Sequence, residues 1–209
     1  MTTAPTVLGV DAGSPGLREA DHLVHHLVDR LGLPAGTVAC THLVRDGDPH
    51  TALSLATADP AVAKAAWHLL TEAEGTGADG TGAGEATAGL GVFLAGRSHG
   101  PAALAEAAAG AAAEAAARTA GRAVVYPGVD GLTGTVTVAE LLDRTPITRL
   151  VVLGSPADER PAPSAEILTS GHVRPEWRAG ELVLPLVPAV GGRLAPFEVP
   201  NPTPCCADH

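Results

Sequence analysis

The segment Gly96–Pro101 combines side chains that could do chemistry with a backbone that could bind an anion. Arg97, Ser98 and His99 stand in a short turn between an apolar run and a long alanine-rich stretch. Free N–H groups at the start of a helix bind anions, and Arg97 would add positive charge. His99 could act as a base or as a metal ligand. The alternative interpretation is an ordinary tight turn with an exposed histidine.

A second candidate segment is Thr169–Pro175, which follows a proline-rich stretch at 156–163. His172 and Arg174 lie in it, and both could return to a cleft formed by earlier strands. His172 would then be a metal ligand or a catalytic base. The alternative is a surface loop.

A third candidate is the C-terminal tail, where Cys205, Cys206 and His209 supply thiolate and imidazole groups. Such soft ligands suit Zn, Cu(I) or Hg. Three ligands are too few for a closed structural zinc site, so a fourth, Cys40 or His42, would come from elsewhere. The alternative is a solvated chain end with two incidental thiols.

The remaining histidines carry less chemical signal. His22, His25 and His26 fall on or beside the polar face of a predicted helix, which favours solvent exposure. His50 and His68 are assigned packing or solvent roles.

Alternating apolar runs and helical patterns predict the elements that position these groups. Buried strands are predicted at 7–10, 38–44, 91–95, 123–126 and 150–153. Helices are predicted at 17–31, 60–70, 101–120 and 138–142. Alternation of this kind favours an α/β fold, with a mostly parallel sheet and helices on both faces.

Three other segments complete the predicted organisation. Residues 181–187 and 193–199 flank Gly191-Gly192, which predicts a β-hairpin or arm within 176–199. The glycine-rich stretch 75–89 is predicted to be a flexible linker, and 200–209 an extended tail.

The two sides of that linker have a similar order of elements. Residues 7–20 and 92–105 each read as strand, polar turn and helix, followed by another strand and a short helix, at 51–53 and 138–141. We interpret this as two similar βαβ halves, 1–74 and 90–175. The alternative is that any alternating α/β chain can be aligned to itself. A cleft is expected at the strand ends, lined by Asp11, Ser14, Arg45, Asp46, Arg97, Ser98, His99, Asp130, Ser155 and Asp158.

Composition limits the classes of function. The net charge of −10 argues against nonspecific nucleic-acid binding, which needs a basic surface. No signal peptide and no apolar stretch of about 20 residues are seen, so we expect a cytoplasmic protein that makes no membrane contact. Three cysteines in that compartment favour metal or thiol chemistry, or no role, over a disulfide framework.

The sequence resembles the class II tetrapyrrole chelatases, the cobalt and iron chelatases of cobalamin and siroheme synthesis. Residues 11–15 and 96–101 resemble the turns that open the two halves of that family, and Gly171-His172-Val173 resembles its later histidine element. This sequence departs from the pattern because Ala12 stands at the first turn's histidine and His99 follows the serine.

The resemblance implies a duplicated α/β protein in which His172 and His99 handle the metal and are catalytic. The metal would be a divalent ion (Co, Fe, Ni or Zn), and Cys205, Cys206 and His209 could add ligands. The substrate would be a tetrapyrrole or another small anionic ligand, bound by Arg97, Ser98, Arg45, Arg174 and Ser14. Asp46, Asp130 or Glu159 could assist as bases.

Three functions therefore stay open at the sequence level. The first is a chelatase-like lyase that inserts a divalent metal in the cleft. The second is a non-catalytic metal-binding or metal-delivery protein that uses the tail. The third is an unrelated small-molecule enzyme that uses Ser98 and His99 with a cleft acid. A homo-oligomer is compatible with each.

Overall fold

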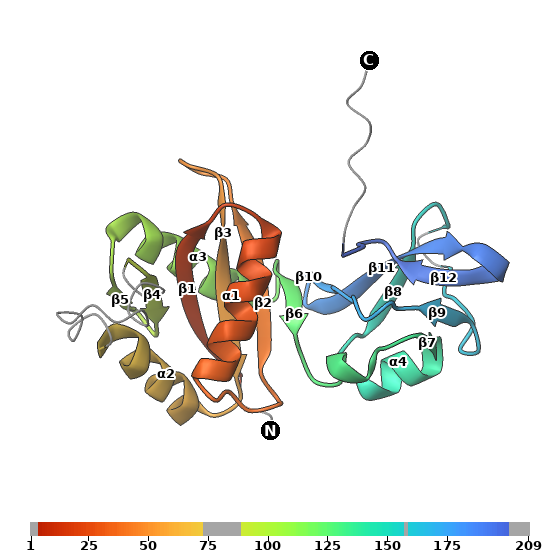
Figure 1. Cartoon of the computed structure of the whole chain (residues 1–209), viewed down its shortest axis with the longest axis horizontal. Coiled ribbons are helices and arrows are strands. Elements are labelled where there is room, and N and C mark those ends of the chain that lie inside the picture. The colour runs from red at the N-terminus through yellow and green to blue at the C-terminus, as the bar shows by residue number, and fades with distance from the viewer. Residues whose placement is uncertain (1–3, 73–88, 157–158, 201–209) are drawn as a thin grey trace, which may run out of the picture. The chain divides into compact units, whose positions relative to one another are not determined.

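The computed structural model describes residues 4–72, 89–156 and 159–200. The chain divides into two compact units. Unit 1 comprises Met1–Pro127 together with Trp177–Gly180, and unit 2 comprises Gly128–Glu176 and Glu181–His209. Each unit has its own strands and helices (Figure 1).

Unit 1 begins with a β-α-β-β-α-β succession. Its elements are β1 (Thr6–Ser14), α1 (Leu17–Arg30), β2 (Val38–Val44), β3 (His50–Thr57), α2 (Pro60–Glu72) and β4 (Gly91–Leu94). The strand order is β4-β1-β3-β2, and each neighbouring pair is antiparallel. This connectivity is the ferredoxin-like, split β-α-β arrangement.

Further elements extend this sheet at both edges. β5 (Arg97–His99) pairs with β4, and β6 (Arg122–Val125) pairs with β2, both antiparallel. Residues 177–178 of the short strand β10 (Glu176–Arg178) follow β6. Between β5 and β6 runs the long helix α3 (Ala102–Ala117).

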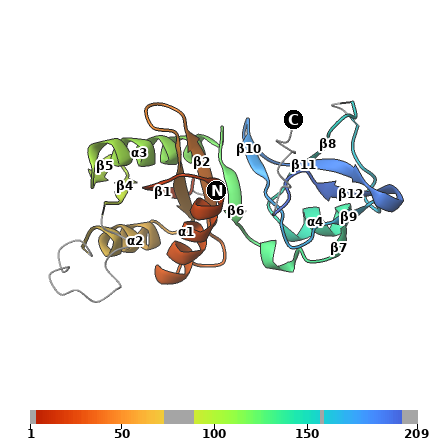
Figure 2. The ribbon, with the colours of Figure 1, turned by 45° about the horizontal axis from the view of Figure 1, so that its top comes forward.

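The sheet of unit 1 has helices on both faces, α1 and α2 on one and α3 on the other (Figure 2). Side chains alternate along β1, so Leu8 and Val10 join the core with α1 and α2, while Val7 packs on the α3 side. α3 approaches very closely because glycine faces it. A Cβ built on Gly9 would lie 1.9 Å from the carbonyl oxygen of Ala108.

Unit 2 is a smaller mixed structure. It contains β7 (Thr135–Thr137), α4 (Val138–Arg144), β8 (Arg149–Val152), β9 (Glu166–Leu168), β11 (Glu181–Ala189) and β12 (Arg193–Pro196). β11 pairs antiparallel with β12 around the short 3₁₀ turn Val190–Gly192, which confirms the predicted hairpin. β8 and β9 pair in parallel with β11 and β12, and β7 closes the edge antiparallel to β9.

The predicted fold class is wrong in its topology. The sheet is mostly antiparallel, and no repeat of two parallel βαβ halves is found in the described residues. The prediction failed at 51–53, which lie within β3 and not in a short helix. Residues 45–49 turn the chain straight back, so β2 and β3 form a hairpin.

The same kind of error affects the turn at 96–101. Ala95 and Gly96 have φ of 48° and 83°, which is the left-handed pair typical of a two-residue hairpin turn. Arg97, Ser98 and His99 therefore form an edge strand paired with β4, and not an anion-binding helix start. The other predicted strands and helices are confirmed as elements.

Candidate active site

Three polar side chains lie on the face of the unit 1 sheet that α3 covers. Cys40 of β2 pairs directly with Ser54 of β3. His42 stands two residues after Cys40 and therefore points to the same face, diagonal to Ser54. All three are buried, with Ser54 0% and His42 4% exposed.

These side chains join a glutamate of α3 in one hydrogen-bonded chain. His42 Nε2 lies 2.8 Å from Ser54 Oγ, and His42 Nδ1 lies 2.8 Å from Glu114 Oε2. A carboxylate can only accept, so Nδ1 carries the proton and donates to Glu114. In the neutral ring, Nε2 is then the acceptor for the Ser54 hydroxyl.

The protonation state of His42 follows from its surroundings. Burial disfavours the charged ring and lowers its pKa below the ordinary value, although the contact with Glu114 acts in the opposite direction. His42 is therefore neutral at pH 7. A hydroxyl, a neutral imidazole and a carboxylate in this order are the parts of an activated serine nucleophile.

Gly121 provides the space that His42 occupies. Its φ is +120°, and a Cβ there would lie 2.7 Å from His42 Cε1 and 3.2 Å from Cys40 Cβ. A side chain at this position would strain the backbone and push the imidazole out of line with Ser54.

A cavity of about 220 Å³ lies over Ser54 and Cys40. Its walls come entirely from unit 1: Pro5, Gly36, Val38, Cys40, Ser54, Ala56, Ala58, Ala115, Arg118 and Trp177. The guanidinium of Arg118 lies 4.9 Å from the centre of the Trp177 ring, and within the described residues it forms no ion pair. The cavity is thus small, largely apolar and positively charged at one position.

Cys40 does not compete with Ser54 as a nucleophile. Burial raises the pKa of its thiol to about 12, against weaker opposing effects of Ser54, Trp177 and Arg122. The reactive form of cysteine is the thiolate, so Cys40 is an inert wall of the cavity at neutral pH.

A second hollow, of about 700 Å³, lies where the β2–β3 turn faces α3. His42 and Glu114 reach it, and so do Arg45, Asp46 and His50. This places the Glu114 end of the hydrogen-bonded chain at a larger, more polar opening than the Ser54 end.

His50 forms a separate pair beside this hollow. Its Nε2 lies 2.6 Å from Asp11 Oδ2, and its Nδ1 lies 2.6 Å from the Asp48 carbonyl oxygen. Burial lowers the pKa of His50, but the acceptors Asp48 and Asp11 outweigh it, so the pKa is raised. Because both ring nitrogens have acceptors, His50 is tied in place, which suits a structural role.

The predicted site residues are dispersed. Arg97, Ser98 and His99 lie on β5, where Arg97 stacks 4.9 Å from the Trp67 ring and His99 meets that ring edge-on at 6.5 Å. Ser14 is buried at the end of β1. Arg45 lines the larger hollow. None of these residues lines the Ser54 cavity.

The predicted residues from the later part of the chain belong to unit 2. His172 Nε2 lies 2.9 Å from Glu198 Oε1, and Arg174 donates to the Val173 carbonyl oxygen. Cys205, Cys206 and His209 lie outside the described residues, as does Asp158. His99 and His172 are thus parts of different units and have different neighbours.

Ser54 and Glu114 were not predicted from the sequence as site residues, and His42 was considered only as a possible fourth metal ligand. One signal was present in the sequence. Cys40, His42 and Ser54 are polar or reactive residues inside otherwise apolar runs, and buried polar groups need partners.

Comparisons with known proteins add no further constraint. No protein-family model, curated protein or solved structure matches the chain. The duplicated parallel architecture implied by the chelatase resemblance is contradicted by the antiparallel sheet, so the structure gives no support to a chelatase, a lyase or a tetrapyrrole-binding protein.

The structure leaves the predicted metal untested. Within residues 4–72, 89–156 and 159–200, no group of three or more His, Cys, Asp or Glu side chains could hold a metal ion. The divalent metal, the homo-oligomer and the cytoplasmic location stay predictions. None of the helices in those ranges is long and apolar enough to cross a membrane.

Proposed function

We propose that unit 1 is a serine-type acyl hydrolase or acyl-transfer module. Ser54 would be the nucleophile, His42 the general base and Glu114 the group that orients His42. The observation that carries this proposal is the unbroken chain of two 2.8 Å contacts, from Ser54 Oγ through the imidazole to the Glu114 carboxylate. Such a nucleophile–base–acid succession is the recognised signature of nucleophilic catalysis.

The reaction follows from the positions of the protons. Ser54 Oγ would attack the carbonyl carbon of an ester or thioester while its proton passes to His42 Nε2. His42 would then return that proton to the departing alcohol or thiol, leaving an acyl group on Ser54. A water molecule, deprotonated by the same nitrogen, would release the acid and regenerate the serine.

The cavity favours a short acyl group. Its volume of about 220 Å³ is below the usual range for small-molecule sites, roughly 300–1,000 Å³. Arg118 is the cationic side chain of its lining and would stabilise negative charge that develops on the carbonyl oxygen.

One observation favours a second candidate, a binding module without catalysis. Ser54 is fully buried, and a buried polar chain of this kind can serve only to satisfy its own hydrogen bonds. The same residues would then shape the cavity without reacting.

Hydrolysis of p-nitrophenyl esters separates these candidates. The first predicts acetate turnover that Ser54→Ala abolishes and that Glu114→Gln lowers about 100-fold, within the range for a general-base system. Ser98→Ala and Glu106→Gln, which change exposed residues outside the chain of contacts, are the matched controls. Equal turnover by Ser54→Ala and the unchanged protein would leave only the binding module.

A further inference from the structure

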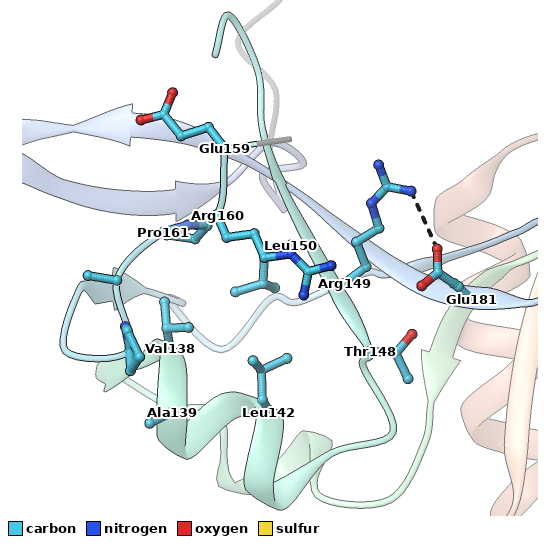
Figure 3. Close-up of a pocket in the computed structure, with 12 residues that line it drawn as sticks. Val138, Ala139, Leu142, Thr148, Arg149, Leu150, Glu159, Arg160, Pro161 and Glu181 are labelled. Carbon is cyan, nitrogen blue, oxygen red and sulfur yellow. Dashed lines mark hydrogen bonds and ion pairs between the residues drawn. The ribbon is translucent and has the colours of Figure 1, made fainter. Parts of the chain in front are cut away.

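Unit 2 contains a hollow of its own, independent of the Ser54 site. Its volume is about 770 Å³, which suits a small organic ligand. The lining comes from α4, β8, the start of β11 and the segment 159–163 (Figure 3). The lining residues are Val138, Ala139, Leu142, Thr148, Arg149, Leu150, Glu159, Arg160, Pro161, Ala162, Pro163 and Glu181.

The apolar walls of this hollow are fixed by hydrogen bonds. The N–H groups of Val138 and Ala139 donate to the carbonyl oxygens of Ala165 and Pro163, both at 2.9 Å. These bonds attach the proline-containing segment to the first turn of α4. Two prolines further restrict the backbone conformation of that segment, so this wall of the hollow is preorganised for a ligand.

Two arginines lie at the edge of the hollow. Arg149 is paired with Glu181 at 3.4 Å, whereas Arg160 has no hydrogen bond or ion pair to another described residue. In Figure 3 the Arg160 side chain reaches across Leu150 into the hollow, and the carboxylate of its neighbour Glu159 points away. Pro161 follows directly and disfavours a helical backbone at Arg160.

The charged side chains around the hollow do not all face it. The lining holds two guanidinium groups and two carboxylates around aliphatic walls: Glu181 is paired with Arg149, and the Glu159 carboxylate points away from the hollow in Figure 3, which leaves Arg160 as the charged group that faces the apolar walls. An arginine with no carboxylate partner among the described residues, at the edge of an apolar hollow, is suited to pair with a carboxylate of a ligand.

We propose that unit 2 binds a monocarboxylate with an apolar body, such as a medium-chain fatty acid. The carboxylate pairs with Arg160, and the chain lies against Val138, Leu142 and Leu150. This site is separate from the proposed serine chemistry, so either proposal can fail while the other stands.

Calorimetric titration of the whole protein with octanoate tests the proposal, with octylamine as the probe of opposite charge. We expect octanoate to bind, octylamine not to bind, and Arg160→Gln to weaken octanoate at least tenfold. Arg30→Gln removes one positive charge from an exposed position on α1 and is the matched control.

A second variant tests the hollow itself. Ala139→Trp would fill the space and abolish octanoate binding while the Ser54-dependent esterase readout stays unchanged. The proposal is overturned by no octanoate binding, by binding that Arg160→Gln leaves unchanged, or by equal binding of octylamine.

Discussion

The Ser54 hydroxyl, the His42 ring and the Glu114 carboxylate differ in how much water reaches them. Ser54 and His42 are buried, while the side chain of Glu114 is 47% exposed. Burial keeps the base neutral, and the carboxyl group that orients it is partly open to solvent. A buried, neutral imidazole is what general-base catalysis needs at neutral pH, because only the neutral ring can take the serine proton.

The pH dependence of catalysis tests this assignment. Because burial lowers the pKa of His42, the base loses its proton below the ordinary histidine value of about 6.5. We expect kcat/KM for p-nitrophenyl acetate to rise with pH, to reach half of its maximum below pH 6.5 and to be constant at higher pH up to about 8. If kcat/KM fell to half of its maximum already above pH 7 as the pH is lowered, the assignment would be contradicted.

At the scale of elements, the site depends on how closely α3 packs on the sheet. Glu114 can reach His42 because glycines at Gly9 and Gly91 let the helix backbone contact the strands. The sequence predicted α3 and β2 well, because their apolar patterns are long. It did not predict that α3 packs over β2 and β3. The reason is that β3 carries small and polar residues on its α3 side, Ser54 and Ala56 among them.

Gly9→Ala tests the close packing. The new Cβ would lie 1.9 Å from Ala108 O, so α3 must move away. We expect a loss of about 1–3 kcal/mol in the free energy of unfolding, measured by urea denaturation, together with reduced esterase activity. Gly110→Ala on the same helix is the control, because nothing lies within 4 Å of its Cβ. It should gain about 0.5–1 kcal/mol. Similar stability for both variants would contradict the packing argument.

The His50–Asp11 pair fastens the start of β3 to the end of β1. A raised pKa means that the folded state holds the proton more tightly than the unfolded chain. The stabilisation is therefore complete below pH 6.5 and is lost as pH rises through the folded pKa. We expect His50→Gln to lower the free energy of unfolding by about 1.5–3 kcal/mol at pH 5.5 and much less at pH 9.

Histidine 68 supplies the control for that measurement. Among the described residues, the exposed His68 side chain forms one ion-pair contact, 3.5 Å from Glu72, so His68→Gln should change stability little at either pH. If His50→Gln lowered the free energy of unfolding by the same amount at pH 5.5 and pH 9, the charged His50–Asp11 pair would not contribute to stability.

At the scale of the whole molecule, unit 1 is discontinuous in sequence. Its main part ends at Pro127. The short segment Trp177–Gly180 also belongs to unit 1, although it follows the first segment of unit 2, Gly128–Glu176, in the sequence. Local patterns cannot predict such a return, because it depends on contacts between segments that are distant in sequence. The residue that returns matters, since Trp177 forms one wall of the Ser54 cavity.

Trp177→Ala tests the contribution of this returning segment. Removing the indole would enlarge the cavity and free Arg118 from its stacking contact. We expect the preference between p-nitrophenyl acetate and hexanoate to shift at least tenfold towards hexanoate, measured as the ratio of kcat/KM values. Trp67→Ala would remove the tryptophan of α2 that belongs to the core on the opposite face of the sheet, so it should lower stability without this shift.

The central claim is that Ser54 is a nucleophile activated by His42. The most direct measurement is the intact mass of the protein after treatment with a fluorophosphonate, followed by mapping of the modified residue. One adduct located at Ser54, absent in Ser54→Ala and strongly slowed in His42→Gln, is the predicted result. No adduct on folded protein, or an adduct at another residue that forms equally fast in His42→Gln, would contradict it.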